Sequence, residues 1–265
     1  MKSKSLAFIA ASVLLAVVMI SCGQKQETAP ETAAPAGNAG GKAVDPATAA
    51  TISGTIKLDG TAPKPKTINM AAEPNCSKLH ADSPAQTEDV VVGDGNALAN
   101  VFVYLTGDFS AYNLPVPSAA GVIDQKGCQY HPHVLGLMAG QSLNVTNSDM
   151  TTHNIHPVPK NNREWNQSQP PGASPIMQSF AHEEVAIPVK CNVHPWMKAY
   201  IAVLGSPYFM VTGKDGQYTI GNVPPGTYTL TVWHELYGAT TQMVTVGASE
   251  KKTVDVSVKA TAGAD

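Results

Sequence analysis

Residues 191–203 read CNVHPWMKAYIAV and carry three kinds of metal-ligating side chain on one short stretch. Cys191, His194 and Met197 follow one another at intervals of three residues, just before an apolar run typical of a β-strand. We expect the cysteine to end one strand, the histidine to lie in a tight loop and the methionine to enter the next strand. One loop would then present three ligands to the same point.

A second segment, NSDMTTHNIH at residues 147–156, supplies a further imidazole from His153. Two histidines, one thiolate and a weak axial thioether are the ligand set of a mononuclear copper electron-transfer centre, and soft sulfur serves oxygen-seeking ions poorly. His156, three residues after His153 in the same run, is the alternative ligand. The sequence therefore predicts one type 1 copper site at His153, Cys191, His194 and Met197.

These two segments resemble the cupredoxins, and in particular the short amicyanin-type ligand loop, which also reads Cys-x-x-His-Pro-aromatic-Met. The resemblance runs from about Val122 to Gly205. It implies a Greek-key β-sandwich over residues 116–205. It also implies that Asn154, directly after the first histidine, helps to hold the copper thiolate, and that electrons pass through the outer edge of His194.

The chain departs from the cupredoxin pattern in a long, polar, proline-rich stretch at residues 157–184. A loop of this length inside a compact domain is usually functional or mobile. Covering the copper end or meeting a partner are the roles we consider for it, beside an ordered excursion without a role.

The remaining part of the chain is also rich in short strand-forming runs. Helical periodicity is almost absent after the first residues, and β-rich runs recur between Gly, Pro, Asn and Asp residues. This pattern is typical of antiparallel sandwiches and predicts an all-β protein.

The C-terminal stretch GKDGQYTIGNVPPGTYTLTVWHE, residues 213–235, resembles the carboxypeptidase-regulatory module, a transthyretin-like (prealbumin/Ig-like) β-sandwich. Tyr208 to Lys259 offer only about four strands, too few for an independent core. ISGTIKLDGTAPK and ALANVFVYLTG, far upstream, resemble the missing strands. We therefore expect one discontinuous sandwich from residues 51–115 and 206–259, with the cupredoxin inserted between them; the alternative is three units in tandem.

The N-terminal residues MKSKSLAFIAASVLLAVVMISC have two lysines, an apolar core and small residues before a cysteine, which predicts a secretory signal over residues 1–22. The end of this stretch resembles a bacterial lipobox, in which Cys22 becomes the lipidated first residue; an ordinary cleaved signal or a signal anchor is the alternative. Residues 23–50 read as a flexible linker. These features predict lipid anchoring at the periplasmic face of a membrane, with the outer membrane favoured because Gly23 follows the cysteine, or at the cell surface.

Two cysteines remain, Cys76 and Cys128. In an oxidising compartment such a pair most often forms a disulfide. The alternative is a second metal site that would also use His80, His131 and His133. His182 and the cluster Trp233-His234-Glu235 are a further, weaker possibility.

The formal net charge of −3 leaves no basic footprint for nucleic acid. The pattern as a whole predicts a membrane-tethered one-electron carrier that exchanges electrons with a redox partner protein the sequence does not name, rather than an enzyme. A copper-dependent redox enzyme would need a second metal. A non-redox protein for copper handling or glycan binding at the cell surface is the third alternative.

Overall fold

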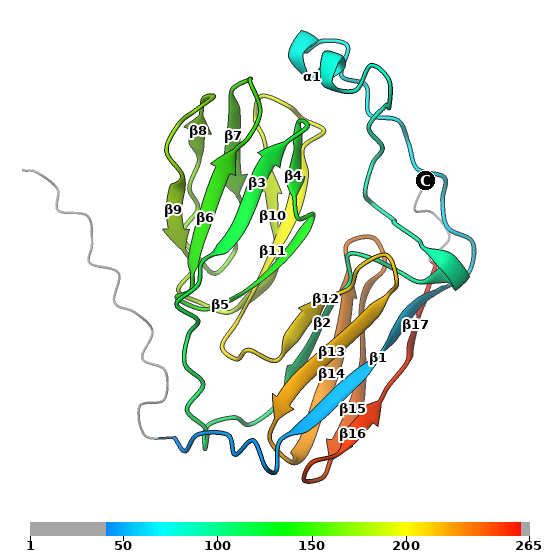
Figure 1. Ribbon diagram of the computed structural model, residues 1–265, viewed down its shortest axis with the longest axis vertical. Coiled ribbons are helices and arrows are strands. Elements are labelled where there is room, and N and C mark those ends of the chain that lie inside the picture. Colours follow the sequence, from blue (N-terminus) through cyan, green and yellow to red (C-terminus); the bar gives the residue numbers. More distant parts are fainter. Residues whose placement is uncertain (1–40, 261–265) are drawn as a thin grey trace, which may run out of the picture. The chain divides into compact units, whose positions relative to one another are not determined.

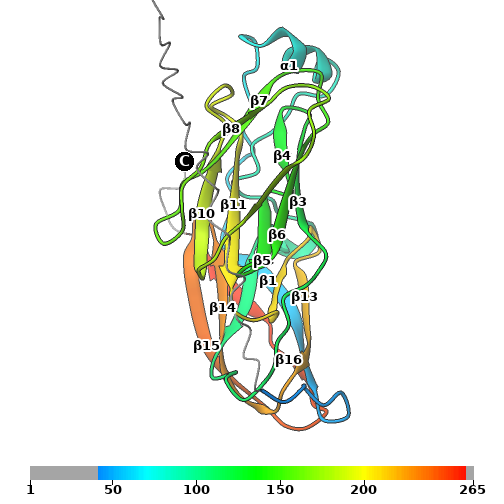
Figure 2. The same ribbon diagram turned by 90° about the vertical axis from the view of Figure 1, so that its left-hand side faces the viewer.

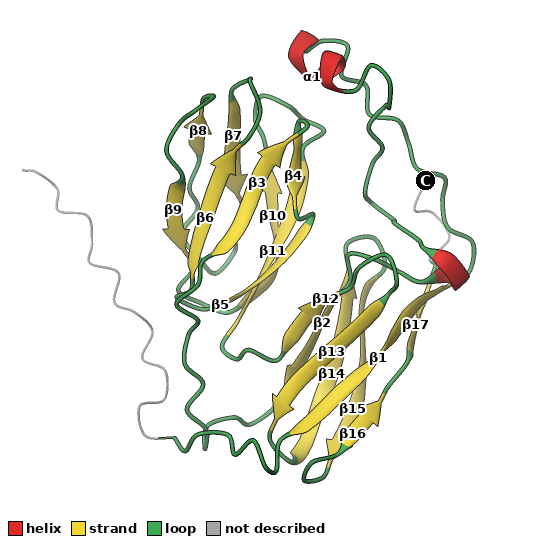
Figure 3. Ribbon diagram, viewed as in Figure 1, coloured by secondary structure: helices red, strands yellow, loops and turns green. Residues whose placement is uncertain are grey.

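The computed structural model describes residues 41–260, which are almost entirely β-structure, as the sequence predicts (Figures 1 and 3). One group of strands is β1 (Ala50–Asp59), β2 (Phe102–Thr106), β12 (Phe209–Val211), β13 (Gln217–Val223), β14 (Gly226–His234), β15 (Gly238–Val246), β16 (Lys251–Thr253) and β17 (Val256–Lys259). The other group is β3 (Gly121–Lys126), β4 (Gln129–His131), β5 (Val134–Met138), β6 (Ser142–Asn147), β7 (His153–Pro157), β8 (Gln167–Gln169), β9 (Ile176–Ser179), β10 (Glu184–Lys190) and β11 (Lys198–Leu204). The helical elements are α1 (Pro74–Leu79) and a single 3-10 turn, η1 (Asp94–Asn96).

The predicted signal over residues 1–22, the lipidated Cys22 and the linker up to residue 40 lie outside the described residues. The last part of the predicted flexible linker, 23–50, is instead held against the chain. The Lys42 N–H donates to Ala111 O (3.0 Å), and the Ser249 N–H donates to Thr48 O (2.9 Å). Within residues 41–260, no helix is long and apolar enough to cross a bilayer.

The first sandwich is assembled from two distant parts of the sequence. One sheet has the order β13-β1-β16, with β17 also paired to β1, and the other has the order β12-β2-β14-β15. Figure 2 shows these sheets as two layers. Alternate residues of β1 face the core: Ile52 lies opposite Ile220 of β13, and Ile56 lies opposite Val256 of β17. Strands before residue 107 therefore complete both sheets of the C-terminal module.

The second sandwich lies between those two parts in sequence. Its sheets have the orders β5-β11-β10-β7-β8 and β4-β3-β6-β9, and both mix parallel with antiparallel pairs. Fully buried aliphatic side chains such as Ile123, Leu143, Ile187 and Ile201 fill the space between the sheets. His153 begins β7, and β10 and β11 flank the 191–197 loop, so the ligands predicted from the sequence gather at one end of this sandwich.

Buried side chains join the two sandwiches. Phe102 of β2 packs in one cluster with Val134 and Ala202 of the second sandwich. Glu235, at the end of β14, accepts hydrogen bonds from His133 Nε2 (2.5 Å) and Lys198 Nζ (2.8 Å). Burial alone would raise the pKa of Glu235, but these two partners hold it below its ordinary value. A buried, fully paired carboxylate of this kind favours one mutual arrangement of the strands that carry its partners.

We predict that residues 206–265 do not fold when they are made alone. In that fragment β13 loses its neighbour β1 and β14 loses its neighbour β2, so each sheet keeps only part of its partners. Circular dichroism should show no cooperative thermal transition, whereas residues 41–265 should unfold cooperatively. A sharp transition in the short fragment would instead favour modules that fold in tandem.

Candidate metal centre

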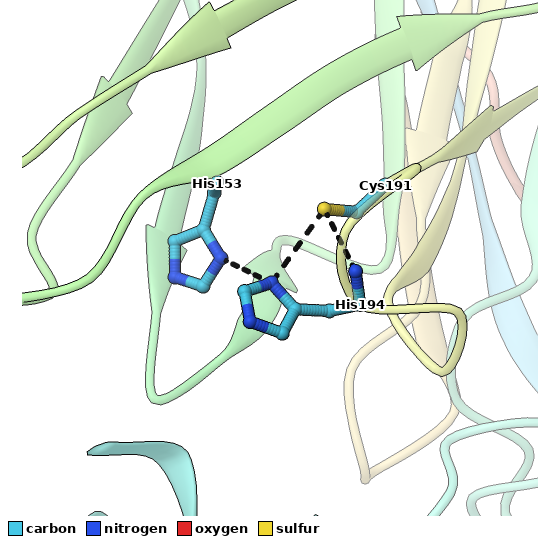
Figure 4. Close-up of side chains that lie close together, drawn as sticks. All are labelled: His153, Cys191 and His194. Carbon is cyan, nitrogen blue, oxygen red and sulfur yellow. Dashed lines mark hydrogen bonds between the residues drawn. The ribbon is translucent and has the colours of Figure 1, made fainter. Parts of the chain in front are cut away.

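Three predicted ligands converge at one buried point (Figure 4). The Nδ1 atoms of His153 and His194 lie 2.9 Å apart, and Cys191 Sγ lies 3.7 Å from His194 Nδ1. The ligating atoms of all three residues lie within 4.8 Å of one another. Both histidines are 0% exposed and Cys191 is 3% exposed. The arrangement is therefore a compact group of two nitrogens and one sulfur shielded from solvent.

The loop between β10 and β11 is narrow because its two ends pair with each other. The Cys191 N–H donates to Met197 O (3.3 Å), and the Met197 N–H donates to His194 O (2.9 Å). The His194 N–H donates to Cys191 Sγ (3.3 Å), so the sulfur is already held by the loop backbone. Met197 is 1% exposed and packs in the same apolar cluster as Cys191.

His153 is oriented by a buried carboxylate. Its Nε2–H donates to Asp149 Oδ2 (2.8 Å), which leaves the Nδ1 lone pair facing His194. Asp149 also accepts the backbone N–H groups of Gly127 and Cys128, both at 2.7 Å. Burial would raise the pKa of Asp149, but these three donors hold it below its ordinary value. A carboxylate behind an imidazole is the usual support of a metal-binding histidine, because it sets both tautomer and ring orientation.

The group stabilises the charged forms of Cys191 and His153 but not that of His194. Burial would raise the pKa of the Cys191 thiol, but the hydrogen bond from His153 and nearby backbone N–H groups lower it below its ordinary value. Burial would lower the pKa of His153, but Asp149 and Cys191 raise it. Burial and the charge on His153 lower the pKa of His194. A thiolate beside a carboxylate thus stabilises a cation between the rings, which is either a proton or a metal ion.

The geometry fits a soft metal ion. With Nε2 of His153 protonated toward Asp149, His194 can donate a hydrogen from its Nδ1 to His153 Nδ1 across 2.9 Å, and a metal ion bound to both nitrogens would take the place of that proton. Two imidazoles with one thiolate, and a thioether packed nearby, suit copper better than ions that seek oxygen.

Asn154 connects the histidine strand to the cysteine loop. Its Oδ1 accepts the N–H of Asn192, directly after Cys191, and its Nδ2 donates to Asn166 Oδ1. Asn154 is buried, so these contacts are shielded from water. Asn154 therefore holds the loop next to Cys191 through its side chain, and a hydrogen bond from its own backbone is among the contacts that lower the pKa of the Cys191 thiol.

The long segment 157–184 does not lie loose over the site. It contributes β8, which pairs with β7, and β9, which pairs with β6. It also supplies Asn166 to Asn154 and Glu164 to His156. The segment is thus a part of the sandwich that braces the ligand strand from outside.

The alternative ligand, His156, lies elsewhere. Its Nε2 contacts Glu164 Oε1 (2.6 Å) and its Nδ1 contacts Asn192 Oδ1 (3.2 Å). His153 and His156 lie three residues apart on β7 and therefore face opposite sides of it. His153 is fully buried and His156 is partly exposed. The histidine that lies with Cys191 and His194 at the candidate site is therefore His153 and not His156.

The remaining cysteines are joined: Cys76 and Cys128 form a disulfide with a sequence separation of 52. Closing a loop of this length stabilises the folded state by about 4 kcal/mol in the chain-entropy model. The bond removes Cys128 from the second group of potential ligands, which it forms with Asp149 and His153.

The other histidines considered for a second metal site have separate contacts. His80 Nε2 lies 2.8 Å from Gly127 O, His133 is bonded to Glu235, and the carbonyl of His182 accepts from Asn162. His234 stacks on the Tyr237 ring. Among residues 41–260, only the group of His153, Cys191 and His194 offers three free ligand atoms close together.

The outer edge of His194, through which electrons are expected to pass, is covered in this structure. The His194 side chain is 0% exposed, Glu73 Oε2 lies 3.9 Å from its Nε2, and the Trp196 ring centre lies 5.1 Å from its own. Sequence reasoning missed Glu73 because it lies more than a hundred residues upstream without any motif. Asp149 lies within the segment 147–156, but only the tertiary structure shows that it supports the His153 ring.

Comparison with known proteins gives one family match. Residues 194–259 match the carboxypeptidase regulatory-like domain. The match begins inside the ligand loop, although β11 pairs with β10 and β5 of the second sandwich. No curated protein was found to match the chain.

Solved structures similar to part of this chain are copper proteins. An oxidised amicyanin variant is 22% identical, with 33% of this chain and 85% of that chain covered and a TM-score of 0.29. A purple cupredoxin from Nitrosopumilus maritimus is 23% identical, with 31% and 98% covered and a TM-score of 0.27. A copper-containing nitrite reductase from Thermus scotoductus SA-01 is 18% identical, with 37% of this chain but only 25% of that chain covered and a TM-score of 0.30. Residues 194–259 are thus similar to a carboxypeptidase regulatory-like domain, and about a third of the chain is covered by each of these structural matches.

We predict that Asp149→Ala weakens metal binding about 10–100-fold, the usual cost of losing the group behind a ligand histidine. The reason is that His153 loses the acceptor of its Nε2–H and with it a defined tautomer. Competition with a chromophoric chelator measures the affinity. Asp124→Ala is the matched control, because the Asp124 carboxylate accepts only from the hydroxyls of Thr146 and Ser148. Equal affinities of the two variants would contradict the role assigned to Asp149.

Proposed function

We propose that this chain is an exported, lipid-anchored type 1 copper protein that carries one electron at a time. The observation that carries this proposal is the convergence of His153 Nδ1, His194 Nδ1 and Cys191 Sγ at one buried point. A bound copper ion would supply a one-electron couple between Cu(I) and Cu(II). Met197, buried in the same cluster as Cys191, is the axial ligand in this proposal.

The residues around the site favour electron transfer by keeping the ligands in place. Asp149 holds His153, the His194 N–H holds the Cys191 sulfur, and Asn154 holds the loop backbone. A ligand frame held by packing and hydrogen bonds moves little when the charge at its centre changes. The buried apolar surroundings exclude water, and with the hydrogen bonds to sulfur they set the potential.

The proposed location depends on the N-terminal sequence. A lysine-flanked apolar stretch that ends at Cys22 supports export and lipidation, and residues 23–40 would supply reach from the membrane. The anchor would hold the protein at the periplasmic face of a membrane, with the outer membrane favoured, or at the cell surface. In this proposal the partner is a redox protein in the same compartment.

We predict that the copper-loaded protein is intensely coloured when oxidised and bleaches on reduction, because thiolate-to-copper charge transfer requires Cys191 bound to Cu(II). Cys191→Ser should abolish the colour even if the imidazoles retain some copper. Visible absorption with a copper assay on the same sample tests this. An intense band that persists in the variant would refute the assignment of the thiolate, and unmutated protein that binds no copper would refute the proposed function.

We predict that Met197→Leu keeps the copper and the colour but raises the reduction potential. The thioether sulfur donates electron density that favours Cu(II), and leucine fills a similar volume without donating it. Voltammetry on the two proteins gives the shift directly. Met177→Leu is the control, because Met177 is 60% exposed on β9 and should leave the potential unchanged. An unchanged potential in the Met197 variant would show that its sulfur does not face the metal.

A further inference from the structure

His194 is more deeply buried than its place in a surface loop explains. The residues on either side, Val193 and Pro195, are both exposed, and Val193 is 47% exposed. His194 itself is 0% exposed, and its Nε2 has no hydrogen-bond partner. Something outside the loop therefore covers this ring.

The covering segment is Met70–His80, which we call the cap. Glu73 of the cap brings a carboxylate oxygen to 3.9 Å from His194 Nε2. The cap has its own small core, in which Met70 and Cys76 pack with Cys128, and Trp196 of the ligand loop packs against the same cluster. The Ser77 hydroxyl donates to Met70 O (2.6 Å), which closes the turn before α1.

Two bonds fasten the cap to the second sandwich. Cys76 is joined to Cys128 by the disulfide, and His80 Nε2 lies 2.8 Å from Gly127 O. Gly127 and Cys128 form the turn between β3 and β4, and both have positive φ angles, 61° and 54°. A cysteine in this region is uncommon, because its Cβ crowds the backbone there. The disulfide and the hydrogen bond of the cap thus both attach to the turn at Gly127 and Cys128.

The peptide groups of Cys128 also bind the two residues that lie against the ligand histidines, Asp149 and Trp196. Its N–H donates to Asp149, which accepts from His153. Its C=O accepts from Trp196 Nε1 (3.0 Å), and the Trp196 ring lies against His194. Cys128 therefore forms the disulfide to the cap and, through its peptide groups, also holds Asp149 behind His153 and Trp196 beside His194.

We propose that the cap is a latched closure of the histidine end of the metal site, and that the Cys76–Cys128 disulfide keeps water and small solutes from His194. Both sulfur atoms belong to fully buried residues, so the closure is a permanent feature of the oxidised, folded chain. The role of the closure in shielding a copper ion rests on the proposed function, whereas the closure itself rests only on contacts within the chain.

The test is hydrogen exchange at the C2 position of each histidine, followed by mass spectrometry on the metal-free full chain. His182 is the exposed internal reference. In the unmutated protein we expect His194 to exchange at least about tenfold more slowly than His182, because exchange then requires local opening. In Cys76→Ser/Cys128→Ser, His194 should approach the rate of His182. Lys78→Ala, at an exposed position of α1, is the matched control and should leave His194 protected.

Fast exchange of His194 in the unmutated chain would overturn the proposal, as would full protection in a folded double-serine variant. The double-serine variant is judged unfolded when buried His153 also exchanges fast. In that case the variant Glu73→Ala/His80→Ala tests the closure instead. That variant keeps the disulfide but removes the cap carboxylate beside His194 Nε2 and the bond to Gly127, and His194 should exchange faster in it than in the Lys78→Ala control. No acceleration there would refute the closure. Because no metal is present, a failure to bind copper would leave these results interpretable.

Discussion

The candidate metal centre depends on one buried carboxylate. Asp149 accepts hydrogen bonds from His153 and from the N–H groups of Gly127 and Cys128, so a ligand ring and a β-turn share the same two oxygens. Cys128 of this β-turn also forms the disulfide to Cys76 of the cap. Removing the carboxylate would leave two turn amides and one imidazole without their acceptor at a largely buried place, and unpaired buried polar groups are costly. The position of His153, the turn and the cap are consequently coupled.

Burial of both histidines has opposing consequences for an electron carrier. It excludes water from the ligands and lowers the polarity around the sulfur, both of which help to set the potential of a bound copper ion. It also places the cap between His194 and any partner, so the imidazole edge is not itself a contact surface. Trp196 is half-buried, lies against the His194 ring and packs against the cap, so it connects the ligand loop to the covering segment.

The regulatory-like sandwich does more than follow the metal-binding one in sequence. It supplies β1 and β2 before the second sandwich and β12 to β17 after it, so both ends of the metal-binding unit are fastened to one core. The cap belongs to the excursion between β1 and β2. A segment that is paired with one sandwich at its base and joined by a disulfide to the other restricts the motion of both. The buried hydrogen bonds of Glu235 to His133 and Lys198 add a specific polar contact to the apolar junction around Phe102.

The sequence by itself determined the all-β class and the ligand set, because strand periodicity and the spacing of Cys191, His194 and Met197 are local properties of the chain. Short strands bounded by turn residues and a three-residue spacing of ligands need no knowledge of distant contacts. His153 and His156, three residues apart, face opposite sides of an extended strand, and only the tertiary structure decided that the side of His153 meets the ligand loop. It also decided that Glu73 and the cap, rather than segment 157–184, cover His194. That contact joins residues more than a hundred positions apart, and such long-range proximity leaves no periodic or spacing signal in a single sequence.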